Sequence, residues 1–286
     1  MPDLWNRRLT AQSFQLAVPL TGPLRMESAL ARRSACSLTP LLQTEVSSPR
    51  LQLTAAADGT MLLRFTITAG CRREAERTGE ELAQQICDLL SVQTNVAIGL
   101  SHEVRRAGGT TVFRELSAQE WDWVAGALIR VKLKHPTFLA AAGWFRRSLL
   151  ASDAMESFCC AFQVIEKISL GYGRQAVSLP VDGCNHDDEH DRSPGVLLAC
   201  LTSELCRQTI SNVRALRRSL LNAGAPDERP ACVPEGLQEG VQQLLPDVKA
   251  AAWSVMTAVR SCYLDQQSPL CAAQDDFLSP GPDESW

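Results

Sequence analysis

Apolar residues recur at two different spacings along this chain, and the change of spacing near Ser117 is the feature that most constrains its fold. Before Ser117, the segments 14–20 and 61–67 alternate apolar residues with less apolar ones, which is typical of half-buried strands. After Ser117, apolar residues recur every three or four positions, as on one face of a helix. The sequence therefore predicts mainly strands first and helices afterwards.

Turn signals organise the first part. Asp58-Gly59 lies between the strand segments 51–55 and 61–68 and tolerates the positive φ of a tight turn, so we expect an antiparallel hairpin there. A second hairpin is expected from 95–100 to 110–116, across a loop that contains Gly108-Gly109. The order of the chain from 21 to 48 is not predicted.

One helix is expected inside this first part, between the two hairpins. Its apolar stripe consists of Leu82, Ile86, Leu89 and Leu90, with charged residues opposite. A single helix packed on an antiparallel sheet is an α+β arrangement.

The second part begins with a strong helix signal. Ser117 and Glu120 form a capping box, which starts a helix that ends before His135-Pro136. A second helix then runs to Leu150, and a third begins at Ser152 or Asp153.

Two more helices are expected beyond a polar loop. The first opens at Ser193-Pro194 and stops at Gly224, and the second runs from about 234 to 263. Pro246 is predicted to kink the second or divide it in two. We thus predict an N-terminal α+β domain (1–115), an all-α helical bundle (116–264) and a mobile tail (265–286).

Composition limits the classes of partner and compartment. The net charge of −4 excludes a protein that coats nucleic acid or membrane by bulk electrostatics, so such binding needs a local patch. No apolar run approaches the roughly 18 residues of a membrane helix, and we expect a cytoplasmic protein. The eleven cysteines lack regular spacing, which indicates reduced thiols used as small core residues. The tryptophans Trp121, Trp123, Trp144 and Trp253 are predicted to be core and interface residues.

A cluster of arginines provides one candidate patch. Arg207, Arg214 and Arg218 are spaced by seven and four residues, which places them on one helix face, with Arg217 at its margin. Such a face either pairs with acidic neighbours in solvent or contacts phosphates as an RNA-binding surface.

The segment Trp144–Ser169, followed by a loop and a helix that ends in NVRALRRSLLNAG, resembles the HEPN superfamily of prokaryotic helical domains. Members carry a helix with an aromatic-rich pattern, matched here by Phe158, Phe162, Ile165 and Glu166. A later helix of the family ends in an arginine, a polar residue, three mostly apolar residues, a histidine and usually a glycine. Arg217 matches the arginine, Arg218 the polar residue, and Asn222 occupies the histidine position. The resemblance covers roughly 117–265.

This resemblance implies a metal-independent endoribonuclease whose site forms across a two-fold dimer, with catalytic roles at Arg217 and at position 222. Histidine moves protons near neutral pH, whereas the carboxamide of Asn222 does not titrate. We therefore expect a degenerate catalytic motif in which Arg217 still stabilises phosphate charge. Asn222 also fits an ordinary helix end, since Asn-Ala-Gly is common C-cap chemistry.

Two further stretches carry ligand or charge signals. In the loop 184–191, Cys184, His186 and His190 are weak candidates for zinc ligands, against the alternative of a solvated acidic loop, so we expect no metal and no cofactor. The basic run Arg130, Lys132, Lys134 and His135 extends a phosphate surface or, more simply, complements the dipole of a helix C-terminus.

Taken with the resemblance, these observations predict a homodimeric HEPN-like protein that binds RNA or a protein partner with little or no catalysis. A role in a prokaryotic defence or toxin-type system is one expectation from the resemblance. The alternative is a structural or regulatory interaction module that binds no nucleic acid. Activity as an enzyme is left open, and no membrane partner is expected.

Overall fold

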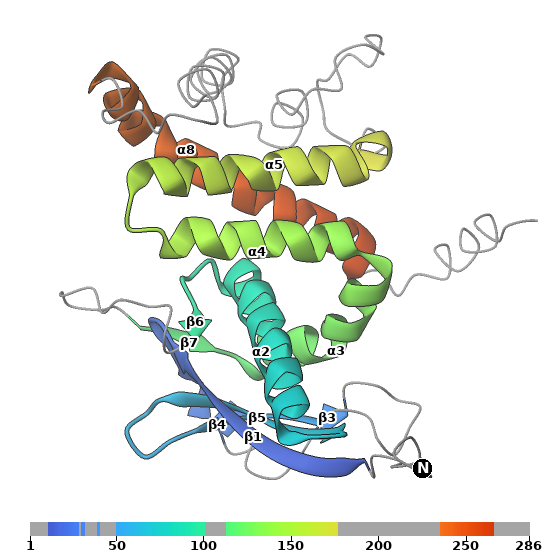
Figure 1. The fold of residues 1–286 in the computed structure, drawn as a ribbon. Coiled ribbons are helices and arrows are strands. Elements are labelled where there is room, and N and C mark those ends of the chain that lie inside the picture. The colour runs from blue at the N-terminus through green and yellow to red at the C-terminus, as the bar shows by residue number, and fades with distance from the viewer. Residues whose placement is uncertain are drawn as a thin grey trace, which may run out of the picture.

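The computed structural model describes residues 11–28, 30–31, 39–40, 50–100, 113–176 and 235–265. Its strands are β1 (Gln12–Thr21), β2 (Leu24–Met26), β3 (Thr39–Pro40), β4 (Arg50–Ala55), β5 (Met61–Ala69), β6 (Gly99–Leu100) and β7 (Arg114–Leu116). Its helices are α2 (Arg72–Thr94), α3 (Ala118–Lys134), α4 (Pro136–Leu150), α5 (Ala154–Ala176) and α8 (Glu235–Val259), which continues into the π-helix η1 (Arg260–Leu264). The predicted α+β class, a sheet with one packed helix followed by helices, is confirmed (Figure 1).

Strands within the described residues form a five-stranded sheet in the order β3-β4-β5-β1-β6, with antiparallel neighbours throughout. The predicted hairpin at Asp58-Gly59 is confirmed, because β4 pairs with β5 from Ala55 and Met61 outward. Gly59 adopts a φ of 84°, a conformation that glycine reaches without steric cost. The Asp58 carboxylate accepts a hydrogen bond from the Thr60 amide at 2.9 Å, which closes the turn.

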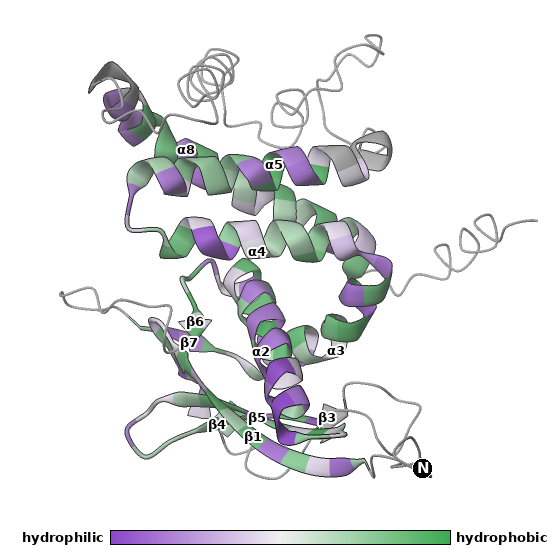
Figure 2. Ribbon diagram, in the orientation of Figure 1, coloured by the Kyte–Doolittle hydropathy of each residue, from purple (hydrophilic) through white to green (hydrophobic). Residues whose placement is uncertain are grey.

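Alternation along β1 and β5 gives the sheet one apolar face, and α2 covers it. Leu16 pairs with Phe65, and these positions point to the same side as Phe14 and Ile67. Gly79 of α2 lies against them, since a Cβ there would come within 2.7 Å of Leu16 Cδ1. Figure 2 shows hydrophobic and hydrophilic residues alternating along α2, as expected of a helix with one buried face.

The second predicted hairpin is wrong for the residues described. β6 pairs with β1 in antiparallel fashion, through Leu100 and Leu20. β7 instead pairs in parallel with β2, with Leu24 opposite Arg114. A local turn signal suggested that the two segments pair with each other, but each pairs with a strand far away in the sequence.

The helix boundaries follow the predicted start and stop signals closely. The Ser117 hydroxyl accepts from the Glu120 amide at 3.2 Å, and the Glu120 carboxylate accepts from the Ser117 amide at 2.9 Å, so the capping box is confirmed. α3 ends before His135 and α4 starts at Pro136, as predicted. The Asp153 carboxylate accepts from the Glu156 amide at 2.8 Å and caps α5.

The last helix differs from its prediction in one respect. Pro246 lies inside α8, which continues through it as one helix and is therefore not divided in two. Beyond Val259 the hydrogen-bonding pattern widens into η1, a π-helix that no sequence signal indicated. None of the described helices is long and apolar enough to cross a membrane.

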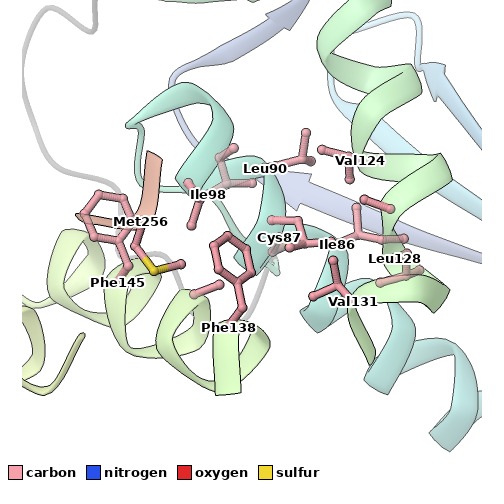
Figure 3. Packing of buried hydrophobic residues seen from close by; sticks show 14 of the residues in the cluster. Ile86, Cys87, Leu90, Ile98, Val124, Leu128, Val131, Phe138, Phe145 and Met256 are labelled. Carbon is pink, nitrogen blue, oxygen red and sulfur yellow. The ribbon is translucent and has the colours of Figure 1, made fainter. Parts of the chain in front are cut away.

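A single apolar core joins the sheet to the helices. In Figure 3, Ile86, Cys87 and Leu90 of α2 lie between side chains of α3 and side chains of α4 and α8. The neighbouring side chains are Val124, Leu128 and Val131 from α3, Phe138 and Phe145 from α4, and Met256 from α8. Helix α2 thus packs both on the sheet and on the helices.

Candidate functional site

The site residues predicted from sequence lie outside the described residues. They are Arg207, Arg214, Arg217, Arg218 and Asn222, together with the weak metal candidates Cys184, His186 and His190. The predicted tail beyond 265 also lies outside. The roles of these site residues remain predictions.

The first pattern of the resemblance lies on α5, within the described residues. Phe158, Phe162 and Ile165 are buried in the core, and the two phenyl rings lie 6.3 Å apart in a stacked arrangement. Glu166 is half-buried, and its carboxylate accepts a hydrogen bond from Gln163 Nε2 at 2.6 Å. The pattern therefore combines three core residues with one carboxylate near the surface.

The basic run at the end of α3 divides into two roles. Arg130 Nη2 donates to the Leu264 carbonyl at 2.7 Å, and His135 Nδ1 lies 3.2 Å from the Tyr172 hydroxyl. Burial raises the pKa of Tyr172 to about 12, so that hydroxyl stays protonated at neutral pH. Lys132 and Lys134 are exposed in the last turn of α3, where cations complement the helix dipole.

A hollow between α2 and α4 on the described surface is lined partly by charged side chains. It has a volume of about 390 Å³, which falls in the range of small-molecule sites. Its lining consists of Gln84 and Asp88 from α2 and of Ala140, Gly143, Trp144, Arg146, Arg147 and Leu150 from α4. We call it the α2–α4 groove.

Helical spacing brings these residues together. Gln84 and Asp88 are four residues apart on α2 and therefore share a face. On α4, Ala140, Gly143 and Arg147 also share a face. A Cβ on Gly143 would lie 3.4 Å from Asp88 Oδ2, so the backbone of α4 and the Asp88 carboxylate lie close together there.

A buried ion pair forms part of the groove lining. Arg146 Nε donates to Asp88 Oδ1 at 2.6 Å, and the two side chains are only 6% and 10% exposed. Withdrawing two charges from water is costly, and their mutual attraction offsets that cost only when geometry and further hydrogen bonds are favourable. The pair has no net charge, and its burial holds both side chains in place.

The rim of the groove carries a second arginine that is held loosely. Arg147 is 63% exposed, and its Nε lies 3.3 Å from the Glu156 carboxylate, which is 46% exposed. Its guanidinium also lies 5.6 Å from the ring centre of Trp144, within the range of a cation–π contact. Exposed ion pairs contribute little free energy, so an incoming anion can compete with Glu156 for Arg147.

Sequence reasoning did not find this groove. Asp88 follows directly on the apolar stripe of α2, and Arg146 adjoins Phe145 on α4, both of which are buried. The sequence offered one signal for it, which is that each helix carries a charged residue on its buried side, Asp88 on α2 and Arg146 on α4. Trp144 was predicted as a core residue, and it does pack against the core while lining the groove.

Other polar contacts of the described residues fasten η1 in place. Asp265 accepts from Trp123 Nε1 and from Arg260 Nε, and Arg260 also donates to Gln93 at the end of α2.

Burial raises the pKa of the Cys160 thiol to about 11, which disfavours its thiolate. No three His, Cys, Asp or Glu side chains gather as metal ligands in the described part of the chain.

Comparison of the chain with protein-family models, with curated proteins and with solved structures finds no match.

Proposed function

We propose that the helical part of this chain binds RNA without cleaving it. The observation that carries the proposal is the sequence match to the resembled family, whose aromatic-rich pattern lies on α5. Phe158, Phe162 and Ile165 anchor that helix in the core, and Glu166 lies near its surface. These positions give the pattern a role in packing α5 and leave RNA contact to the arginine-bearing segment.

The arginine-bearing segment gives the proposal its chemistry. Arg207, Arg214 and Arg218 share a helical spacing, and forked guanidinium donors suit phosphate oxygens. Asn222 stands where the resembled family has its histidine, and a carboxamide transfers no proton near neutral pH. Loss of general acid–base catalysis removes a rate factor on the order of 10² to 10⁴.

Fluorescence anisotropy with a labelled single-stranded RNA over a series of salt concentrations tests the binding. Affinity should fall steeply with salt, because phosphate contacts release counterions. The double variant Arg214→Glu/Arg218→Glu should bind at least tenfold more weakly. The matched control is Arg72→Glu/Arg77→Glu, which reverses two exposed arginines that pair with Glu76 and Glu81 on α2. Equal affinities for the two double variants, or no RNA binding, would favour the interaction-module alternative.

A nuclease assay tests the second half of the proposal. The natural chain should leave RNA intact, and Asn222→His should introduce cleavage that Arg217→Ala removes. Robust cleavage by the natural chain that disappears in Arg217→Ala would show that another residue moves the proton. His186 and His190 would then be the first to substitute.

We also propose a homodimer in which Arg217 and Asn222 lie near the symmetry-related pair, as the resemblance implies. Light scattering at micromolar concentration should give twice the mass of the chain, which is 31.2 kDa. A monomeric mass would contradict this arrangement and leave each arginine cluster as a separate surface patch.

A further inference from the structure

We propose that a second copy of this chain binds to the outer edge of β1, through antiparallel pairing of the two β1 strands about a two-fold axis at Gln15. This inference goes beyond the proposed RNA binding and rests on the sheet. None of the arginines assigned to RNA belongs to β1, and neither Arg217 nor Asn222 does, so it stands or falls independently of those proposals.

The outer edge of β1 is open over most of its length within the described part of the chain. On one side of β1, β5 pairs with residues 12–19. On the other side, β6 pairs only with Leu20 and Thr21, and none of the described strands lies beside 12–19 there. Backbone N–H and C=O groups along such an edge can pair with a further strand.

The side chains at this edge are also incompletely covered. Phe14, Leu16 and Val18 point to the apolar face of the sheet, but all three are only half-buried. Each is paired with a residue of β5 that is at most 3% exposed. A strand that pairs with the outer edge and presents apolar side chains at alternate positions would cover them.

The charge of β1 favours a second copy as the partner. This strand has ten residues, QSFQLAVPLT, and none of them is charged. Long edge strands are commonly protected from self-pairing by charged side chains, and β1 lacks that protection. Two copies of β1 therefore meet without bringing like charges together.

A two-fold axis at Gln15 also matches the pattern of side chains. It pairs residues 12–18 of one copy with the same residues of the other, so that Phe14 lies opposite Leu16 and each Gln15 lies opposite its counterpart. Residues directly opposite each other lie on the same face, so apolar side chains meet apolar ones. Pro19, which has no N–H to donate, stays outside the paired stretch.

This contact is expected to be weak and reversible. Two strands of this length bury less than the roughly 1,200–2,000 Å² of a stable interface. Pairing through β1 should therefore appear well above micromolar concentration. If the chain also dimerises elsewhere, two different two-fold contacts would join dimers into larger assemblies.

Hydrogen–deuterium exchange of the full chain, measured from micromolar to millimolar concentration, tests whether the cover comes from a second copy. Exchange of the β1 amides should slow as the concentration rises, because pairing removes them from solvent. Slow exchange that is the same at every concentration would show that another segment of the same chain covers the edge, and would overturn the inference.

Substitutions at the two-fold axis test the register. Gln15 is exposed, and Gln15→Lys places two like charges directly opposite each other, which should weaken self-association about fivefold in light scattering at high concentration. Thr66→Lys is the matched control. Thr66 pairs with Gln15 on the same face, but it lies on β5 between β1 and β4, so this variant should associate like the natural chain.

A mixture of opposite charges provides a readout that misfolding cannot imitate. Gln15→Glu alone should associate as weakly as Gln15→Lys, and an equimolar mixture of the two should associate at least as well as the natural chain. The inference is overturned if the mass of the natural chain does not rise with concentration, if Gln15→Lys and Thr66→Lys associate equally, or if the mixture associates no better than either variant alone.

Discussion

Helix α2 packs on the sheet through its first half and on α4 through its second half, and the two contacts differ in chemistry. Toward the sheet, Gly79 lies so close to Leu16 that a Cβ would come within 2.7 Å of its Cδ1. Toward α4, Asp88 pairs with Arg146 beside a groove of about 390 Å³. The first contact is apolar and has no spare volume, so it fixes position. The second contains a buried ion pair beside a hollow, so charge as well as apolar packing joins the two helices.

The largest expected effect comes from breaking the ion pair on the α4 side. Arg146→Met leaves the Asp88 carboxylate buried without its cation, which should lower the free energy of unfolding by about 3–5 kcal/mol. Urea denaturation measures the loss. Arg72→Met removes an exposed arginine with a similar partner and should cost about 1 kcal/mol or less.

The double variant Asp88→Leu/Arg146→Met tests whether the loss of stability comes from the unpaired Asp88 carboxylate. Replacing both charges with apolar groups leaves neither unpaired, so it should be more stable than Arg146→Met alone. If Arg146→Met lowers the free energy of unfolding no more than Arg72→Met does, the buried pair stabilises the fold no more than an exposed pair. The two halves of α2 would then not differ as described.

An intermediate effect is expected on the sheet side. Gly79→Val adds three carbon atoms where β1 is already in close contact, and overpacking of this kind costs about 1–3 kcal/mol. Gly126→Val is the control, because a Cβ there meets nothing within 4 Å and valine favours a helix more than glycine does. Thermal unfolding should show a lower Tm for the first variant only, and equal Tm values would mean that the sheet adjusts to the larger side chain.

The smallest effect concerns the end of α2. Trp253 Nε1 donates to the Val92 carbonyl at 2.9 Å, and carbonyls in the last turn of a helix have no partner within it. Trp253→Phe removes this hydrogen bond and should cost about 1 kcal/mol beyond the loss of apolar contact. Trp123→Phe, which removes a bond to the partly exposed Asp265, should cost less in the same urea titration. The reverse order would contradict a role for Trp253 in capping α2.

Local signals predicted most of the fold. The Asp58-Gly59 turn and the Ser117 capping box each depend on residues within four positions of one another, so the sequence contains the whole interaction. The hairpin expected between 95–100 and 110–116 failed because strand choice depends on distant partners. β6 joined β1 and β7 joined β2, about 80 and 90 residues back along the chain.

The groove could not be predicted from the sequence for the same reason. Asp88 and Arg146 are 58 positions apart, and they meet only because α2 crosses α4 at that point. Sequence periodicity gives the buried face of each helix and does not give the crossing point. Arg217 and Asn222, by contrast, were found through a local pattern and stay predictions.

The position of α8 has a consequence for the order of events during synthesis. Val248, Val255 and Met256 of this helix are fully buried in the core that α2, α4 and α5 share. A ribosome adds about 5–20 residues per second, so the end of α8 at 259 follows the end of α5 at 176 by roughly 4–17 s. During that interval, α5 lacks the cover that α8 provides. A nascent chain stalled before 235 should therefore be a better chaperone client than the finished protein.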